Sequence, residues 1–148
     1  MPRSPLTLAA LATAAVPGLD ARSALAVEDP GDYDTAVVTD ADGARWTVRA
    51  PRSLQAGAAL EAEAELLTSL QLYADTGVLS FAVPRISGTA LLPEGGRAVV
   101  HPALDGTTLD VDVLRPGPGL AADLGRVLAS IHELPRTIVD DATQDADD

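Results

Sequence analysis

Apolar and polar positions near the start of the chain predict a helix. Residues 6–16 are almost all apolar, Ser4 and Pro5 stand before them as a capping residue and a first-turn proline, and Pro17-Gly18 follows as a stop signal. The same stretch is also typical of a secretory signal peptide, because Arg3 precedes an apolar run that contains small residues. We expect an amphipathic helix of a cytoplasmic protein; the alternative is a cleaved signal on a small acidic exported protein.

Three β-rich segments follow this helix. Residues 24–28 and 33–39 predict strands on either side of an Asp-Pro-Gly-Asp turn, and residues 45–50 alternate between the two faces of a strand. One face carries Trp46, Val48 and Ala50, and the other carries Arg45, Thr47 and Arg49. The second and third segments are therefore expected to form a hairpin, with Gly43 in the turn where a positive φ is needed.

The second half of the chain adds two helices and two strands. Residues 56–74 are rich in Ala, Leu and Glu, which predicts a long helix, and residues 86–92 and 97–101 predict strands joined by a Pro-Glu-Gly-Gly turn. Residues 107–114 are expected to form one or two helical turns. A last helix follows, because its large apolar residues share one face: Leu120, Leu124, Val127, Leu128, Ile131 and Leu134. This order predicts an α+β layer built on an antiparallel sheet.

The chain is expected to have three parts. Residues 1–104 hold all the predicted strands and form a folded lobe, residues 105–135 form a hinge-like segment with the last helix, and residues 136–148 form an acidic tail. Ile138 and Val139 are the only large apolar residues of this tail, which carries five Asp residues within nine positions. With little to bury and a self-repelling charge, the tail is expected to be disordered.

Charge and composition narrow the function. The chain has 148 residues, with 10 basic against 22 acidic side chains and a formal net charge of −12, so nucleic acid and anionic membranes would be repelled and are not expected as partners. All ten basic residues are Arg. The absence of Cys and Lys excludes disulfides, thiolate metal sites, Schiff bases and the lysine of a Walker A loop. No window holds the ~18 apolar residues of a membrane span.

One charged pair points to chemistry. On a helical wheel, Glu63 falls within the apolar arc of the 56–74 helix, between Leu67 and Leu70. The arc holds Ala59, Ala62, Leu66, Leu67, Leu70 and Tyr73. A carboxylate in that position is desolvated unless it finds a cation, and Arg49 on the preceding strand supplies one. A strand cation paired with a carboxylate on the following helix is how a kinase positions nucleotide phosphates. The alternatives are a structural ion pair and a Glu63 that extends into solvent at the helix edge.

A second feature is the segment of residues 99–106, Val-Val-His-Pro-Ala-Leu-Asp-Gly. A buried strand that runs into Pro102 and ends at Gly106 presents backbone N–H and C=O groups outside the sheet ladder. Such groups can bind the edge of a purine. The alternative is that this segment is a simple connection between a strand and a helix.

These segments resemble a known family. Residues 42–52, Asp-Gly-Ala-Arg-Trp-Thr-Val-Arg-Ala-Pro-Arg, and residues 60–67 look like the amino-terminal lobe of aminoglycoside/macrolide phosphotransferases, and the Trp-x-x-Arg-x-Pro-Arg strand is closer to the macrolide branch. Later landmarks follow in the same order: Phe81-Ala-Val-Pro-Arg, the Gly95-Gly96 hairpin, Val100-His-Pro-Ala-Leu-Asp-Gly and Leu124-Gly-Arg-Val-Leu-Ala-Ser-Ile-His. The resemblance covers residues 5–136.

The resemblance implies a protein-kinase-like N-lobe over residues 1–104. Such a lobe has a five-stranded antiparallel sheet, an N-terminal helix, a long helix after strand three and a helix after the hinge. ATP or GTP with Mg would bind between two lobes. The turn at residues 28–33 has a single Gly, so it is not expected to form a glycine-rich phosphate loop.

The resemblance also implies roles for particular residues. Arg49 would stand where the family has the strand-three lysine, and Glu63 would be its helix partner. Arg keeps the positive charge and adds a planar fork of donors. His101, Pro102 and Ala103 would form the hinge whose backbone binds the base.

The residues that carry catalysis in this family are not matched here. The family's catalytic Asp and its magnesium ligands lie in a His-Gly-Asp loop and later residues of the second lobe. Here His132 is followed by Glu-Leu-Pro and is expected to pack or cap, and Asp140 and Asp141 have no Asn at kinase spacing. We therefore assign no catalytic or metal-binding residue, and we expect no turnover by this chain alone.

Two kinds of partner follow from the resemblance. The leading hypothesis is the nucleotide-binding lobe of an antibiotic phosphotransferase-like kinase, with nucleotide and either the second lobe or another copy of this chain as partners. The alternative is a non-catalytic interaction module, a pseudokinase-like lobe.

Overall fold

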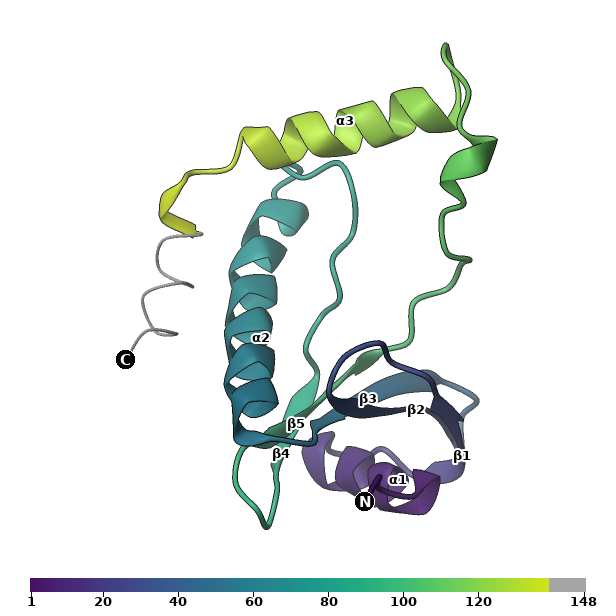
Figure 1. Cartoon of the computed structure of the whole chain (residues 1–148), viewed down its shortest axis with the longest axis vertical. Coiled ribbons are helices and arrows are strands. Elements are labelled where there is room, and N and C mark those ends of the chain that lie inside the picture. Colours follow the sequence, from purple (N-terminus) through teal and green to yellow (C-terminus); the bar gives the residue numbers. More distant parts are fainter. Residues whose placement is uncertain (139–148) are drawn as a thin grey trace.

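One antiparallel sheet organises the chain (Figure 1). The computed structural model describes residues 1–138. Its strands are β1 (Ala21–Val27), β2 (Tyr33–Asp40), β3 (Arg45–Pro51), β4 (Gly88–Leu91) and β5 (Arg97–Pro102), in the spatial order β1-β2-β3-β5-β4. The five strands and three α-helices confirm the predicted α+β class. The first strand begins earlier than predicted, and β4 is shorter than the predicted 86–92 strand.

The β2–β3 hairpin forms where the alternation predicted it. Asp40 closes the turn, because its Oδ1 accepts the N–H groups of Asp42 and Ala44, both at 2.9 Å. Gly43 takes a φ of +83° in this turn, a conformation that costs glycine little. The ladder then pairs Thr35 with Arg49 and Ala36 with Val48, which fixes the face on which each residue lies.

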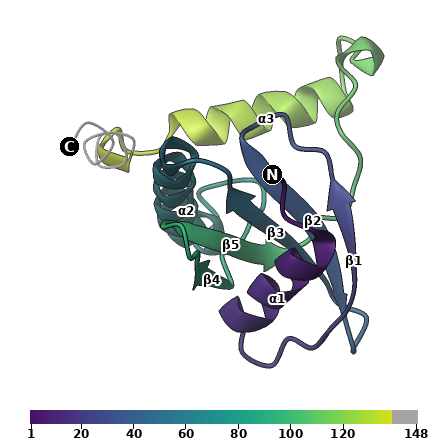
Figure 2. The ribbon, with the colours of Figure 1, turned by 60° about the horizontal axis from the view of Figure 1, so that its bottom comes forward.

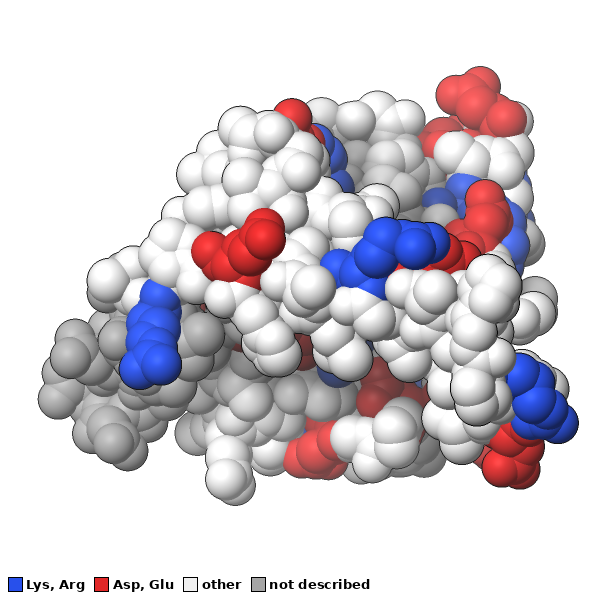
Figure 3. Space-filling view, turned by 90° about the horizontal axis from the view of Figure 1, so that it is seen from above, with Lys and Arg blue, Asp and Glu red and all other residues white. Residues whose placement is uncertain are grey.

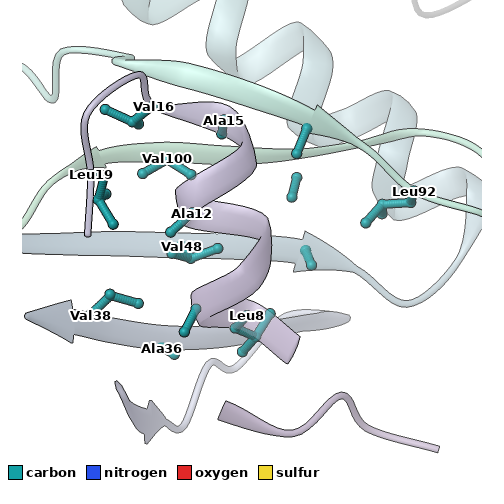
Figure 4. Packing of buried hydrophobic residues seen from close by; sticks show 14 residues of the cluster. Leu8, Ala12, Ala15, Val16, Leu19, Ala36, Val38, Val48, Leu92 and Val100 are labelled. Atoms are coloured by element: carbon teal, nitrogen blue, oxygen red, sulfur yellow. The ribbon is translucent and has the colours of Figure 1, made fainter. Parts of the chain in front are cut away.

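Helix α1 (Pro5–Ala15) covers one face of the sheet, as Figure 4 shows. The Ser4 hydroxyl accepts the N–H of Thr7 at 3.2 Å and caps the helix, as the sequence predicted. Leu8 is 1% exposed, and the side chains around it are small, which lets the helix lie close to the strands. The core between helix and sheet contains Leu8, Ala12, Val38, Val48, Ala50, Ala98 and Val100 among its members.

Helix α2 (Leu54–Asp75) begins at a Ser53 cap and contacts β3 and β5 (Figure 1). Its buried residues are Ala56, Gly57 and Leu60, whereas Ala59, which the wheel placed in the apolar arc, is exposed. The start of the helix packs on the end of β3 and on the β4–β5 turn, since a Cβ on Gly57 would lie 3.7 Å from Pro51 Cγ and 4.0 Å from the Cα of Gly96. Residues 56, 57 and 60 therefore form the packed face of the first turns of α2.

Helix α3 (Leu120–His132) lies across the far end of α2, away from the sheet (Figures 1 and 2). An extended segment leads to it from β5, and the helical turns predicted over 107–114 reduce to one 3-10 turn at Val111–Val113. The hydroxyls of Ser80 and Ser130 meet at 3.3 Å and join the segment after α2 to α3. Within the described residues, no helix has the length and apolar character needed to cross a bilayer. The predicted tail lies outside the described residues from position 139 onward.

Candidate functional site

Arg49 and Glu63 meet as the sequence predicted. Arg49 lies on β3 and points away from α1, since its neighbours Val48 and Ala50 are fully buried on the α1 side. Its Nη1 donates to Glu63 Oε1 at 2.8 Å, which joins β3 to α2. The strand cation and the helix carboxylate therefore form one ion pair on the sheet face opposite α1.

The exposure of Glu63 differs from the helical-wheel prediction. Its side chain is 45% exposed, whereas that of Arg49 is 19% exposed. Glu63 lies at the border of the packed face, because the sheet contacts the first turns of α2 rather than the predicted arc. Water screens a pair of this kind, so its contribution to stability is small, and its effect is to orient Arg49.

A third charged residue, Asp29, completes the cluster. Asp29 belongs to the turn between β1 and β2, and its Oδ2 lies 3.4 Å from Arg49 Nε. It also accepts the Gly31 N–H and the Thr35 hydroxyl, both at 2.9 Å. Burial alone raises the pKa of Asp29, but these two donors and the charge of Arg49 outweigh it and hold the pKa below 3.8. Asp29 is therefore a carboxylate at neutral pH.

Sequence reasoning did not find Asp29. The signal that was present is the hairpin register, because Thr35 pairs directly with Arg49 across β2 and β3. A turn residue that bonds to Thr35 must lie near Arg49. The distance between Asp29 and Arg49 along the sequence does not predict their contact, because the contact depends on how the β1–β2 turn folds back.

An aromatic ring lies against the guanidinium of Arg49. Its Cζ is 4.4 Å from the centre of the Tyr33 ring, which is a cation–π contact. The ring also lies close to the turn, because a Cβ on Gly31 would come within 2.7 Å of it. Tyr33, Asp29 and Glu63 together hold the guanidinium in one place.

The sheet face around Arg49 carries exposed apolar side chains. Strand register places Val27, Thr35 and Val99 in line with Arg49, and the next row is formed by Leu25, Val37, Thr47 and His101. Leu25 is 73% exposed and Val27 is 45% exposed. An apolar surface beside a fixed cation is suited to a ligand with a flat apolar part and an anionic part.

The predicted hinge residues lie at the end of β5. The Ala103 N–H donates to the Arg45 carbonyl at 2.9 Å, so it is committed to the ladder with β3. Antiparallel pairing alternates, and therefore the backbone groups of His101 and Ala103 face β3, whereas the carbonyl of Pro102 faces the other side. His101 Nδ1 lies 2.9 Å from the Pro102 carbonyl oxygen.

An apolar pocket of about 760 Å³ lies between the end of α2, residues 79–84 and the end of α3. Leu66, Leu67, Leu70, Phe81, Ile131 and Leu134 are among its lining residues. His132, which the sequence predicted to pack or cap, lies in the last turn of α3, lines this pocket and is exposed. Figure 3 looks down on the α3 side of the molecule and shows charged side chains separated by broad uncharged areas.

Comparisons with known proteins identify the family and similar folds. A profile of the phosphotransferase enzyme family matches residues 26–147. The structure of the GDP complex of aminoglycoside 2'-phosphotransferase-IIIa is similar with a TM-score of 0.73 at 19% identity, and the match covers 95% of this chain and 46% of that one. Macrolide 2'-phosphotransferase type I gives 0.64 at 28% identity, over 93% and 46%.

A third solved structure is also similar in fold. The macrolide 2'-phosphotransferase MphH from Brachybacterium faecium, as apoenzyme, gives a TM-score of 0.62 at 24% identity, over 84% of this chain and 42% of that one. This chain thus spans less than half the length of these similar structures. A comparison with curated proteins gives no match.

Proposed function

Because the chain belongs to the phosphotransferase enzyme family, we propose that residues 1–104 are the nucleotide-binding lobe of a small-molecule kinase, with residues 105–135 as its hinge and following helix. The observation that carries the proposal is the Arg49–Glu63 pair at 2.8 Å. A guanidinium fixed by a carboxylate presents its remaining donors in a planar fork, which suits phosphate oxygens. Arg49 would bind the phosphates of ATP or GTP, and Glu63 would orient it.

The base would bind between the sheet and the hinge. The exposed Leu25 and Val27 offer an apolar cover for a purine ring, which accounts for large apolar side chains in contact with water on this face. We place the polar edge of the base against Pro102 and its neighbours. The Pro102 carbonyl faces away from β3 and would bind the base with the acceptor site that the contact with His101 Nδ1 leaves open, while Ala103 would hold the end of the strand through its bond to Arg45.

Nucleotide titration tests the proposal. Wild-type protein should bind GDP or ATP in calorimetry, and Arg49→Ala should weaken binding by at least ~10-fold, because a charged hydrogen bond to phosphate is lost. Arg22→Ala is the matched control, since Arg22 is an exposed strand arginine paired only with Asp20 among its described contacts. Equal affinity in wild type and Arg49→Ala would contradict the role of Arg49.

The phosphate acceptor is proposed to be a macrolide or aminoglycoside antibiotic, as the names of the similar structures suggest. We further propose that these 148 residues do not transfer phosphate by themselves. They contain no His-Gly-Asp loop, and among residues 1–138 no three His, Asp or Glu side chains come together as a metal site, so no magnesium ligand is assigned to them. Phosphate release with nucleotide and either antibiotic should stay at background, and turnover at an ordinary enzyme rate would contradict this.

A second candidate function is docking of another polypeptide. The described residues leave large apolar side chains exposed along the approach to α3 and on the helix: Leu104, Leu109, Val111, Val113, Leu120, Leu128 and Ile131. Surfaces of this kind mark interaction sites. We propose that they contact the second half of the family fold or another copy of this chain. Light scattering measures the molar mass in solution and tests self-association. A monomer at high protein concentration contradicts self-association of this chain.

The proposal includes a cytoplasmic location, where nucleoside triphosphates are available. Mass spectrometry of the native N-terminus tests it. An intact Met1 or Pro2 agrees with the proposal, and cleavage near Ala15 contradicts it.

A further inference from the structure

The Asp29 carboxylate lies among donors that suit a larger anion. Gly31 gives a backbone N–H, Thr35 gives a hydroxyl and Arg49 gives a guanidinium, with distances of 2.9, 2.9 and 3.4 Å to the carboxylate oxygens. A turn N–H, a hydroxyl and a guanidinium are the groups with which proteins bind phosphate oxygens. The side chain of Asp29 is only 15% exposed, so it fills this position rather than extending into water.

The two carboxylates on Arg49 are not equivalent. Glu63 on α2 is half-exposed and contacts Arg49 Nη1 at 2.8 Å, which is shorter than the 3.4 Å between Asp29 and Arg49 Nε. Asp29 approaches along Nε from the β1–β2 turn, which is the side on which the exposed apolar surface of Leu25 and Val27 lies. A nucleotide that covers this surface would bring its phosphates toward Asp29 and not toward Glu63.

A phosphate and the Asp29 carboxylate cannot use the same donors together. Two anions at one guanidinium repel each other, and each donor hydrogen satisfies one strong acceptor. Since Asp29 is ionised at neutral pH, the repulsion is present under ordinary conditions.

We propose that Asp29 is an internal competitor of nucleotide phosphate: it occupies the anion position formed by Gly31, Thr35 and Arg49, and a nucleotide binds there by displacing it. This inference rests on the proposed nucleotide-binding function. The β1–β2 turn would then act differently from a glycine-rich loop. In the absence of nucleotide, the Gly31 N–H of the turn donates to the Asp29 carboxylate of the same turn. The turn therefore sets the affinity for nucleotide.

Calorimetric titration with GDP compares wild type, Asp29→Asn and Asp32→Asn. Asp32 lies in the same turn and its side chain is exposed, so it matches the charge change without touching Arg49 in the described contacts. Asp29→Asn should bind GDP at least ~10-fold more tightly than wild type, because the competing charge is removed, and Asp32→Asn should stay within ~3-fold of wild type.

Each other outcome is decisive. If wild type binds GDP and Asp29→Asn binds equally or more weakly, Asp29 instead positions Arg49 and the inference is wrong while the proposed function stands. If neither protein binds GDP, both fail. Should Asp29→Asn not fold, the amide resonance of Gly31 in wild type gives the answer: it should shift on GDP binding as Asp29 releases it, and an unmoved resonance in a protein that binds GDP overturns the inference.

Discussion

Asp34→Asn should strongly destabilise the fold. Asp34 is the most buried carboxylate among the described ion pairs, with a side chain 3% exposed. Its Oδ2 accepts the backbone N–H and Nη1 of Arg3 at 3.0 and 3.1 Å, and its Oδ1 accepts Nε of Arg52 at 2.7 Å. Arg3 also donates to the Pro51 carbonyl at 2.9 Å and pairs with Glu94. One carboxylate thus joins the N-terminus to β2, the end of β3 and the β4–β5 hairpin.

The magnitude follows from these contacts. A hydrogen bond to a charged group contributes about 1.5–3 kcal/mol, and the bond to Arg52 counts for less because that side chain is 45% exposed. Asn keeps one acceptor oxygen but turns an amide N–H₂ toward a guanidinium. The expected loss is about 3 kcal/mol, at the lower end of the range for breaking a buried ion pair. With a urea slope of ~2 kcal/mol/M, the midpoint falls by about 1.5 M.

Urea unfolding followed by circular dichroism at neutral pH measures the loss, with Asp32→Asn as the exposed control. Burial alone raises the pKa of Asp34, but the donors of Arg3 and Arg52 and the charge of Arg52 outweigh it and lower the pKa below 3.8. The stability from Asp34 is therefore present above that value and lost as the pH falls through the folded-state pKa, so the two proteins should converge in acid. A loss below ~1 kcal/mol, or one equal to that of the control, would refute the reasoning.

Three further predictions follow from single contacts. Leu8→Ala should cost about 3–4 kcal/mol in urea unfolding, because the side chain is 1% exposed, whereas Leu6→Ala on the same helix, where Leu6 is 80% exposed, should cost little; similar losses would contradict the packing of α1. Gly88→Ala should lower the melting temperature sharply, since a Cβ there would lie 2.0 Å from the carbonyl oxygen of the last residue of α1, and an unchanged melting temperature would refute that approach. Trp46 fluorescence should follow the titration of Asp40, and its midpoint should lie at a lower pH than that of an exposed Asp, because the Trp46 Nε1–H first, and then backbone donors, lower the pKa of Asp40; a midpoint equal to that of an exposed Asp would contradict the 3.0 Å bond.

Much of the fold could be predicted from local patterns. The alternation over residues 45–50 placed Arg49 opposite Val48 and Ala50, and this assignment holds because successive side chains of any strand point to opposite faces. The wheel likewise brought Glu63 toward Arg49. It placed Ala59 wrongly, because α2 packs on Pro51 and Gly96 through Gly57, and such a contact between residues far apart in sequence is not contained in the helical period.

The part of the site that the sequence missed depends on long-range geometry. Asp29 reaches Arg49 only because the β1–β2 turn folds back over the hairpin, and turn composition does not fix that path. The Ala103 N–H donates to the Arg45 carbonyl because of the register between β3 and β5. The side-chain alternation within either strand does not predict that register.

By itself, the sequence determined which segments form strands and helices, the two faces of β3, the absence of lysine and cysteine chemistry, and the strand arginine and helix carboxylate that meet. These follow from backbone periods, capping residues and composition, all of which are local. The tertiary structure alone decided that Asp29 shares Arg49, that Asp34 is buried between two arginines, and that α3 lies at the far end of α2. Such contacts depend on the register and placement of separate elements, which only the folded chain brings together.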